Sequence, residues 1–64
     1  MIVFYKTIFV RDLENNLVAD HVIRSSSEDI VNSVTDAFEF AMTQYAKDYK
    51  VYVTPLNMTY MEDN

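Results

Sequence analysis

A chain of 64 residues that contains no cysteine and a single histidine has to fold on its hydrophobic residues alone. A domain of this size buries only about 60% of the surface that its unfolded chain exposes. Such domains commonly gain further stability from disulfides, bound metals or oligomerisation. Disulfides and thiolate metal sites are excluded here, and His21 cannot hold a zinc ion by itself. Self-association is the support that remains, and we expect a homodimer.

The first part of the chain has the composition of a β-hairpin. Residues 2–10 are dense in β-branched and aromatic side chains, which is typical of a strand, and residues 17–24 predict a second strand. The segment between them, residues 12–16, is rich in Asp and Asn. Asn adopts positive φ at little cost, so this segment predicts the turn.

The register of the hairpin depends on the length of that turn. If Asn15 and Asn16 form a two-residue turn, Arg11 lies opposite Asp20 and, further along, Ile8 lies opposite Ile23. This register pairs opposite charges across the two strands, which stabilises a hairpin.

A helix is predicted from about Ser27 to Lys47. The serines of residues 25–27 supply an N-cap oxygen, and the two acids that follow meet the positive end of the helix dipole. Hydrophobic residues then recur at helical spacing and predict the stripe that is buried against the sheet. The residues of this stripe are Ile30, Val34, Ala37, Phe38, Ala41 and Tyr45.

The rest of the chain returns to strand patterns. Residues 49–54 predict a third strand, which Pro55 interrupts, and residues 56–61 alternate again as either an extra C-terminal strand or a loose arm. The element order is β-β-α-β. We therefore predict a single α+β domain, an antiparallel three-stranded sheet with one helix packed on one face.

The two faces of this sheet are both hydrophobic in part. The face that takes the helix carries Ile2, Phe4, Ile8, Val10, Ala19 and Ile23. The other face is more hydrophobic than a sheet face that is left in water, although open faces with scattered aromatic residues also occur. We expect this second face to pack against a second copy of the chain, back to back. The predicted dimer interface consists of Val3, Tyr5, Phe9, Val18 and Val22.

Acidic residues outnumber basic ones by ten to five, which gives a net charge of −5 and a pI of about 4.4. Such a surface repels DNA, RNA and anionic lipid and attracts basic proteins. The hydrophobic residues near the start are interrupted by Lys6 and are too few for a membrane span of about 20 residues. We expect no membrane segment, no signal peptide and a cytoplasmic location.

Catalytic motifs are missing. A chain without glycine cannot contain a Walker loop, a dinucleotide-binding turn or a nucleophile elbow. His21 lies near three serines, but those serines are better explained as helix-capping residues. We therefore expect neither an enzyme nor a cofactor or metal site.

The predicted helix carries an acidic strip, formed by Glu28, Asp29, Asp36 and Glu39 without a basic residue among them. At 100° per residue these carboxylates fall within about a third of the helix circumference. The helix dipole accounts for the first two but not for Asp36 and Glu39, and Phe40 projects beside them. The predicted partner-binding residues are Glu28, Asp29, Asp36, Glu39 and Phe40, extended on the hairpin by Asp12, Glu14 and Asp20.

Two classes of small host-takeover proteins of bacteriophages resemble this chain. Early inhibitors of bacterial RNA polymerase from podoviruses are similar in length and element order over residues 5–53, with an acidic helix start such as residues 27–29 and aromatic residues such as Phe40 and Tyr45. Acidic viral proteins that imitate DNA and occupy nucleoid proteins such as HU are similar in net charge, in predicted dimerisation and in the strip of residues 28–39.

These resemblances imply a function in binding rather than in catalysis. The leading hypothesis is an inhibitor that presents acidic groups where DNA would bind and blocks a basic, HU-like host protein. Two alternatives stay open: an inhibitor that binds a basic channel of RNA polymerase, and a self-assembling structural protein whose hydrophobic sheet face drives association.

Overall fold

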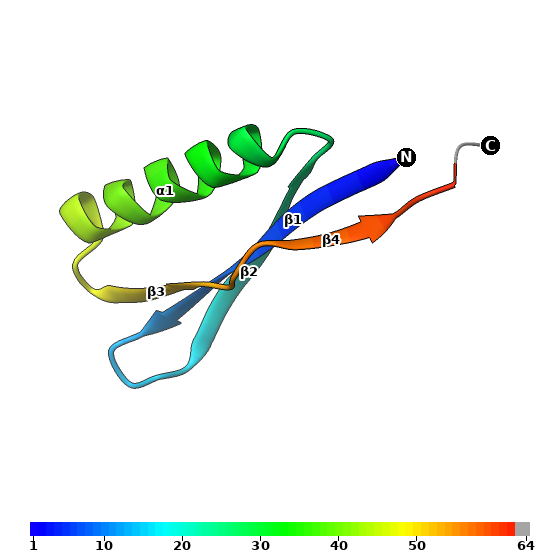
Figure 1. Ribbon diagram of the computed structural model, residues 1–64. Helices are drawn as coiled ribbons and strands as arrows, with labels where there is room; N and C mark the ends of the chain where they lie inside the picture. The colour runs from blue at the N-terminus through cyan, green and yellow to red at the C-terminus, as the bar shows by residue number, and fades with distance from the viewer. Residues whose placement is uncertain (63–64) are drawn as a thin grey trace.

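The computed structural model describes residues 1–62 and shows a four-stranded antiparallel sheet with one helix across one face (Figure 1). The predicted α+β class and β-β-α-β order are confirmed, and the C-terminal segment forms an extra strand. The elements are β1 (Ile2–Asp12), β2 (Leu17–Ser25), α1 (Glu28–Tyr45), β3 (Tyr49–Val53) and β4 (Asn57–Tyr60).

Strand β1 is the centre of the sheet. β2 pairs along one side of it, whereas β3 and β4 pair one after the other along its second side. Between β3 and β4, the backbone N–H of Thr54 donates to the Thr7 carbonyl at 2.9 Å. In return, the Thr7 N–H donates to the Thr54 hydroxyl, also at 2.9 Å. This pair of hydrogen bonds holds the chain against β1 where the strand pairing is interrupted.

The hairpin turn is longer than the predicted two-residue turn. The Asn15 N–H donates to the Asp12 carbonyl at 3.0 Å, and the Asp12 N–H donates to the Asn16 carbonyl at 3.0 Å. Asn15 has a φ of 70°. These features define a three-residue loop, in which a turn is followed by one residue in the left-handed region. The prediction that an Asn supplies the positive φ is confirmed.

The loop and an irregularity of the strand pairing between Val10 and Arg11 together move the register of residues 19–25 by two, whereas Arg11 pairs with Leu17. The predicted pairs of Arg11 with Asp20 and of Ile8 with Ile23 are therefore wrong, and Ile8 lies opposite His21 instead. Side chains alternate between the faces of a sheet with a period of two, so a shift of two leaves residues 19–25 on their predicted faces.

The hydrophobic core between α1 and the sheet is small. Ile8 and Val10 of β1 and Val31 of α1 are buried in it. The remaining buried hydrophobic residue, Val3, lies on the opposite face of the sheet. Of the other residues predicted to face the helix, Phe4, Ala19 and Ile23 are half-buried and Ile2 is exposed.

Helix α1 begins as predicted and ends slightly early. Ser27 is the N-cap, and its hydroxyl accepts the backbone N–H of Ile30 at 3.4 Å. The helix ends at Tyr45, where Ala46 leaves the helical conformation, rather than at Lys47.

The side of α1 that faces the sheet differs from its predicted stripe. Val31 and Thr35 are buried, whereas Ile30 is 54% and Val34 is 44% exposed. Of the predicted stripe, Phe38 alone is partly buried. The Thr35 hydroxyl donates to the Val31 carbonyl at 2.8 Å, so this polar residue is buried with its hydrogen bond satisfied. A pattern based on hydropathy counts this residue as exposed.

The molecule is elongated, with extents of 42 × 20 × 17 Å. β1 and β4 extend past the N-terminal end of α1, which covers only part of the sheet (Figure 1). At this end the Met1 ammonium donates to the Met61 carbonyl at 2.9 Å, and the Met61 N–H donates to the Met1 carbonyl at 2.8 Å. The two ends of the described chain are thereby held side by side.

Candidate functional site

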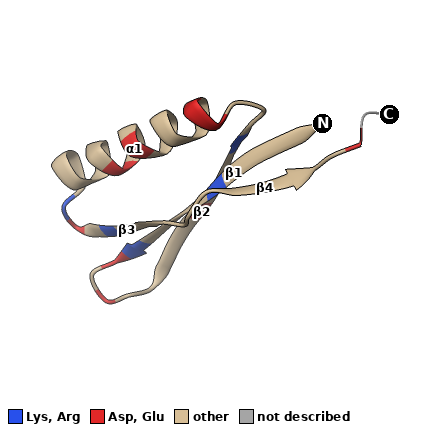
Figure 2. Cartoon of the chain, viewed as in Figure 1, with Lys and Arg blue, Asp and Glu red and all other residues tan. Residues whose placement is uncertain are grey.

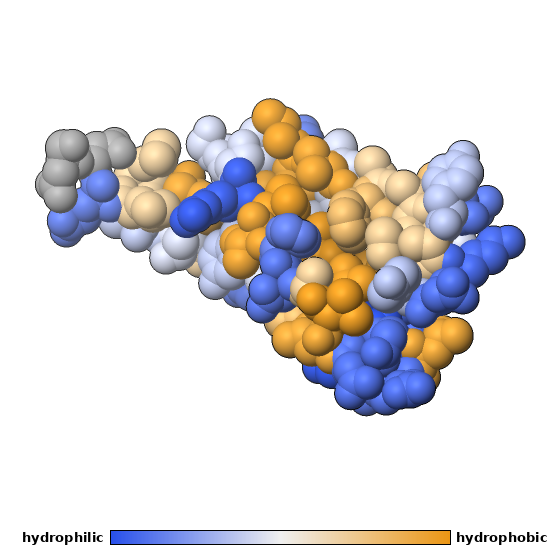
Figure 3. Space-filling model, turned by 180° about the vertical axis from the view of Figure 1, so that it is seen from behind, coloured by the Kyte–Doolittle hydropathy of each residue, from blue (hydrophilic) through white to orange (hydrophobic). Residues whose placement is uncertain are grey.

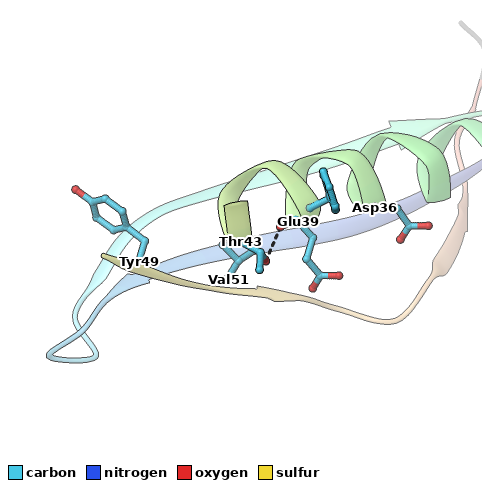
Figure 4. Close-up of a pocket in the computed structure, with 6 residues that line it drawn as sticks. Asp36, Glu39, Thr43, Tyr49 and Val51 are labelled. Carbon is cyan, nitrogen blue, oxygen red and sulfur yellow. Dashed lines mark hydrogen bonds between the residues drawn. The ribbon is translucent and has the colours of Figure 1, made fainter. Parts of the chain in front are cut away.

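One flank of α1 brings two carboxylates and an aromatic ring together beside β3. Asp36 and Glu39 project from the helix toward this strand (Figure 4), and Phe40 is 64% exposed. They border an open groove of about 370 Å³. We call this surface the acidic groove, and it is lined by Asp36, Glu39, Phe40, Thr43, Tyr49 and Val51.

The local structure explains how this groove is built. Val51 lies opposite the buried Val10 in the β1–β3 ladder, so it and Tyr49, two residues before it, share the sheet face that α1 covers. Thr43 directs its hydroxyl back to the Glu39 carbonyl at 2.8 Å (Figure 4). The wall of the groove is thus formed by about two turns of helix, from Asp36 to Thr43, and the floor by the start of β3.

Charge is divided unevenly between α1 and the sheet (Figure 2). α1 contains four acidic and no basic residues, and the rest of the chain contains six acidic and five basic residues, so the helix holds −4 of the net −5. Asp36 and Glu39 are three residues apart, and like charges at this spacing destabilise a helix by a few tenths of a kcal/mol. The stability of the fold therefore does not explain why these two acids lie together.

The other two acids of the predicted strip lie apart from the groove. Glu28 and Asp29 occupy the first turn of α1, where they complement the helix dipole. Of the predicted helix residues, the structure brings Asp36, Glu39 and Phe40 together and places the first two acids at the opposite end of the helix.

The hairpin acids have separate surroundings. The Asp12 carboxylate accepts the backbone N–H groups of Glu14 at 3.0 Å and of Asn16 at 2.8 Å, and the Asn16 side-chain amide at 3.1 Å. These hydrogen bonds, chiefly those from Asn16, hold the pKa of Asp12 below its ordinary value of 3.8. Glu14 is exposed in the turn, and Asp20 lies opposite Phe9 on the face away from the helix. None of the three lines the acidic groove.

Three lining residues, Thr43, Tyr49 and Val51, were not among the residues predicted from the sequence. Their signal was available in part. An antiparallel β3 beside β1 alternates its side chains, which places either the odd or the even residues of the strand under the helix. The rotation of α1 about its axis decides which helix residues lie beside these strand residues. Because the sequence does not reveal this rotation, the lining residues could not be predicted.

The opposite flank of α1 is hydrophobic and lies on the β2 side. The acidic groove borders β3 while Val31 and Thr35 face the sheet, so helical periodicity assigns the remaining flank to the side of β2. We call it the apolar flank, and its residues, all exposed, are Ile30, Val34, Ala37, Ala41 and Tyr45. In the view from behind, hydrophobic residues gather in a band across the middle of the molecule, interrupted by hydrophilic ones (Figure 3).

The face predicted as a back-to-back dimer interface is partly covered within one chain. Val3 is only 5% exposed, Tyr5 and Phe9 are half-buried, and Val18 and Val22 are exposed. Arg24, Thr59 and Met61 line a groove on this face together with three of these residues. The surface available to a partner there is smaller than the sequence pattern indicates.

Comparisons with known proteins leave the surfaces as the basis for a functional argument. No family model matches the sequence, and no curated protein or solved structure matches it. Within residues 1–62, no helix is long and apolar enough to cross a membrane. In the same residues, no group of three or more His, Asp or Glu side chains is arranged to hold a metal ion.

Proposed function

We propose that this protein is a small cytoplasmic inhibitor that binds a basic nucleic-acid-binding protein through the acidic groove and blocks its access to DNA. A host nucleoid protein of the HU type is the first target to test. The observation that carries the proposal is the position of Phe40, an exposed aromatic ring beside Asp36 and Glu39 on a helix without basic residues.

The groove offers the two kinds of contact that a DNA-binding surface can accept from a protein. The carboxylates of Asp36 and Glu39 can take the place of phosphate groups beside Lys and Arg side chains. Asp29 precedes Asp36 by seven residues, roughly 10 Å along the axis at 1.5 Å per residue, and continues the row of charge. Phe40 adds a hydrophobic anchor bordered by charges, a composition common among residues that dominate binding energy.

The two contacts predict a specific salt dependence. Exposed charges are screened over about 8 Å at physiological ionic strength, so the carboxylate contribution falls as salt rises. Electrostatic attraction also speeds association, so salt should slow binding more than it speeds dissociation. The part of the affinity that persists at high salt should depend on Phe40.

The direct test is a competition experiment with a labelled DNA duplex bound to purified HU-type protein, followed by fluorescence anisotropy at low and high salt. The double variant D36N/E39Q should inhibit roughly tenfold less well at low salt, because each exposed ion pair contributes up to about 1 kcal/mol. The matched control is D48N/E62Q, which makes the same change in net charge outside α1. Equal losses in both double variants would show that net charge alone acts and that the groove has no role.

The target itself needs a second measurement. The protein is immobilised and exposed to bacterial lysate, and the retained proteins are identified at low and high salt. RNA polymerase subunits that D36N/E39Q fails to retain would move the target from a nucleoid protein to polymerase. Retention that is unchanged in D36N/E39Q would remove the acidic groove from either mechanism.

A further inference from the structure

The two edges of the sheet are protected to very different degrees. The edge formed by β3 and β4 consists of strands of five and four residues, separated by a segment that contains Pro55, and it carries Lys50. β2 forms the other edge with nine continuous residues and contains neither Pro nor Lys. Short strands, Pro, charged side chains and β-bulges are features that keep a sheet edge from pairing with another chain. β2 is long and lacks Pro, its irregularity lies near its first residues, and its two charged residues, Asp20 and Arg24, have opposite signs.

We propose that β2 pairs with β2 of a second copy of this chain. The two strands run antiparallel about a two-fold axis at Val22 and join both sheets into one. This interface lies at the sheet edge and on the apolar flank, away from the acidic groove, and it does not rest on the proposed function.

The register follows from the regular part of β2. Its pairing with β1 is interrupted between Val10 and Arg11, so the regular ladder covers residues 19–25, and Val22 is the midpoint of that range. Asp20 and Arg24 lie at equal distances on either side of Val22. A symmetric antiparallel pair centred there places Asp20 of each copy opposite Arg24 of the other. Two pairs of opposite charge then stabilise this register.

The apolar flank favours a second copy over a single extended peptide. A two-fold axis normal to the sheet brings both helices to the same face, with their apolar flanks turned toward each other. Three strand spacings of about 4.8 Å separate the two β1 strands, so the helices lie roughly 14 Å apart. His21 and Ile23 of both copies lie between them, beneath Ile30 and Val34. A peptide strand would cover the backbone edge and leave the flank in water.

A further argument is the small core of one chain. Between α1 and the sheet it buries the hydrophobic side chains of Ile8, Val10 and Val31, whereas the apolar flank of α1 stays exposed. In the dimer the sheet continues across the two-fold axis and the two apolar flanks face each other, which extends the same core. The acidic grooves are left at the two outer edges, where both stay open.

The test is sedimentation equilibrium of the full chain and of three charge variants. D20R and R24D each place like charges opposite each other twice, so each should weaken dimerisation roughly tenfold or more. The double variant D20R/R24D restores opposite charges in the same register and should recover the dimer. Circular dichroism verifies that each variant is folded.

A second variant examines the helix side of the interface. Val34→Lys places a charge on the apolar flank and should also weaken the dimer. Ser33→Lys, which adds the same charge at an exposed neighbouring position, should leave it intact. A chain that stays monomeric at high concentration overturns the proposal. A dimer that none of these variants weakens also overturns it. In such a dimer, cross-links from a photo-reactive residue placed at position 9 would identify the back-to-back face as the interface instead.

Discussion

The flank of α1 beside β3 carries Asp36 and Glu39, and the flank beside β2 carries Ile30 and Val34, yet both flanks are exposed. The buried ridge that separates them is narrow and includes a threonine. The difference teaches that the strongest hydrophobic pattern on a helix of a very small protein need not mark its core. One helix of 18 residues here offers three surfaces, of which only one is used to fold the single chain.

The largest effect on stability should come from truncating a side chain in the core beneath α1, on which both flanks depend. Ile8 is fully buried beneath α1, and Ile8→Ala should cost about 2–5 kcal/mol. A domain of this length has a total stability of about 3–10 kcal/mol, so the variant should lose a large part of its stability and unfold at a much lower urea concentration than the parent chain. Urea unfolding followed by circular dichroism measures this. An Ile8→Ala variant that unfolds at the same urea concentration as the parent chain would contradict the position of the core.

A smaller loss of stability should distinguish the buried side of α1 from the apolar flank. Val31→Ala should cost about 2 kcal/mol, since a buried side chain loses two methyl groups. Ile30→Ala should change the stability of dilute protein by less than about 0.5 kcal/mol, because its side chain is already in water. The reverse order would mean that the helix packs on the stripe that hydropathy predicts.

On the acidic flank, a stabilising change should abolish binding. Glu39→Lys replaces a like-charge pair with Asp36 by an opposite-charge pair and should raise the free energy of unfolding by about 0.2–0.5 kcal/mol. The same variant should lose inhibition of the basic target. Glu39→Gln, which only removes the repulsion, is the control and should gain less stability. A loss of stability in both variants would show that Glu39 serves the fold.

The smallest effect on stability at neutral pH should come from Asp12, which lies in the hairpin turn and on neither flank of α1. The pKa of Asp12 is lowered in the folded state, so its stabilising contribution is present above its ordinary value of 3.8 and is lost as the pH falls through the folded value. Asp12→Asn should therefore lose less stability between neutral and strongly acidic pH than the parent chain. Urea melts at both pH values check this, and parallel losses in the two proteins would contradict it.

The element order and the N-cap at Ser27 could be predicted because each has a local signal in the sequence. The alternation of residues 56–61 left a strand and a loose arm open, and the structure decides for the strand. The turn could be predicted in kind but not in length, since the carboxylate of Asp12 organises it through hydrogen bonds that composition does not reveal. The rotation of α1 could not be predicted. The buried side of the helix includes Thr35, whose hydroxyl is satisfied within the helix, whereas the exposed Ile30 and Val34 dominate the hydrophobic periodicity.

For the candidate site, the sequence predicted Asp36, Glu39 and Phe40 as neighbours because they lie within one helical turn. It could not exclude Asp12 and Asp20 from the same surface. Their distance from the groove follows from the turn length and from the face on which each strand residue lies. Tyr49 needed the same tertiary information, because it meets the helix only after β3 has paired with β1.

The three residues that join β3 to β4 also decide which way the end of the chain faces. Ile8 pairs with Val53 but Phe4 pairs with Met58, so an odd residue of β3 and an even residue of β4 share one face. An insertion or deletion of one residue in this joint would send Met58 and Tyr60 to the other side without altering any strand. Length variation at this joint is therefore an evolutionary route to a new surface, and a single codon would suffice.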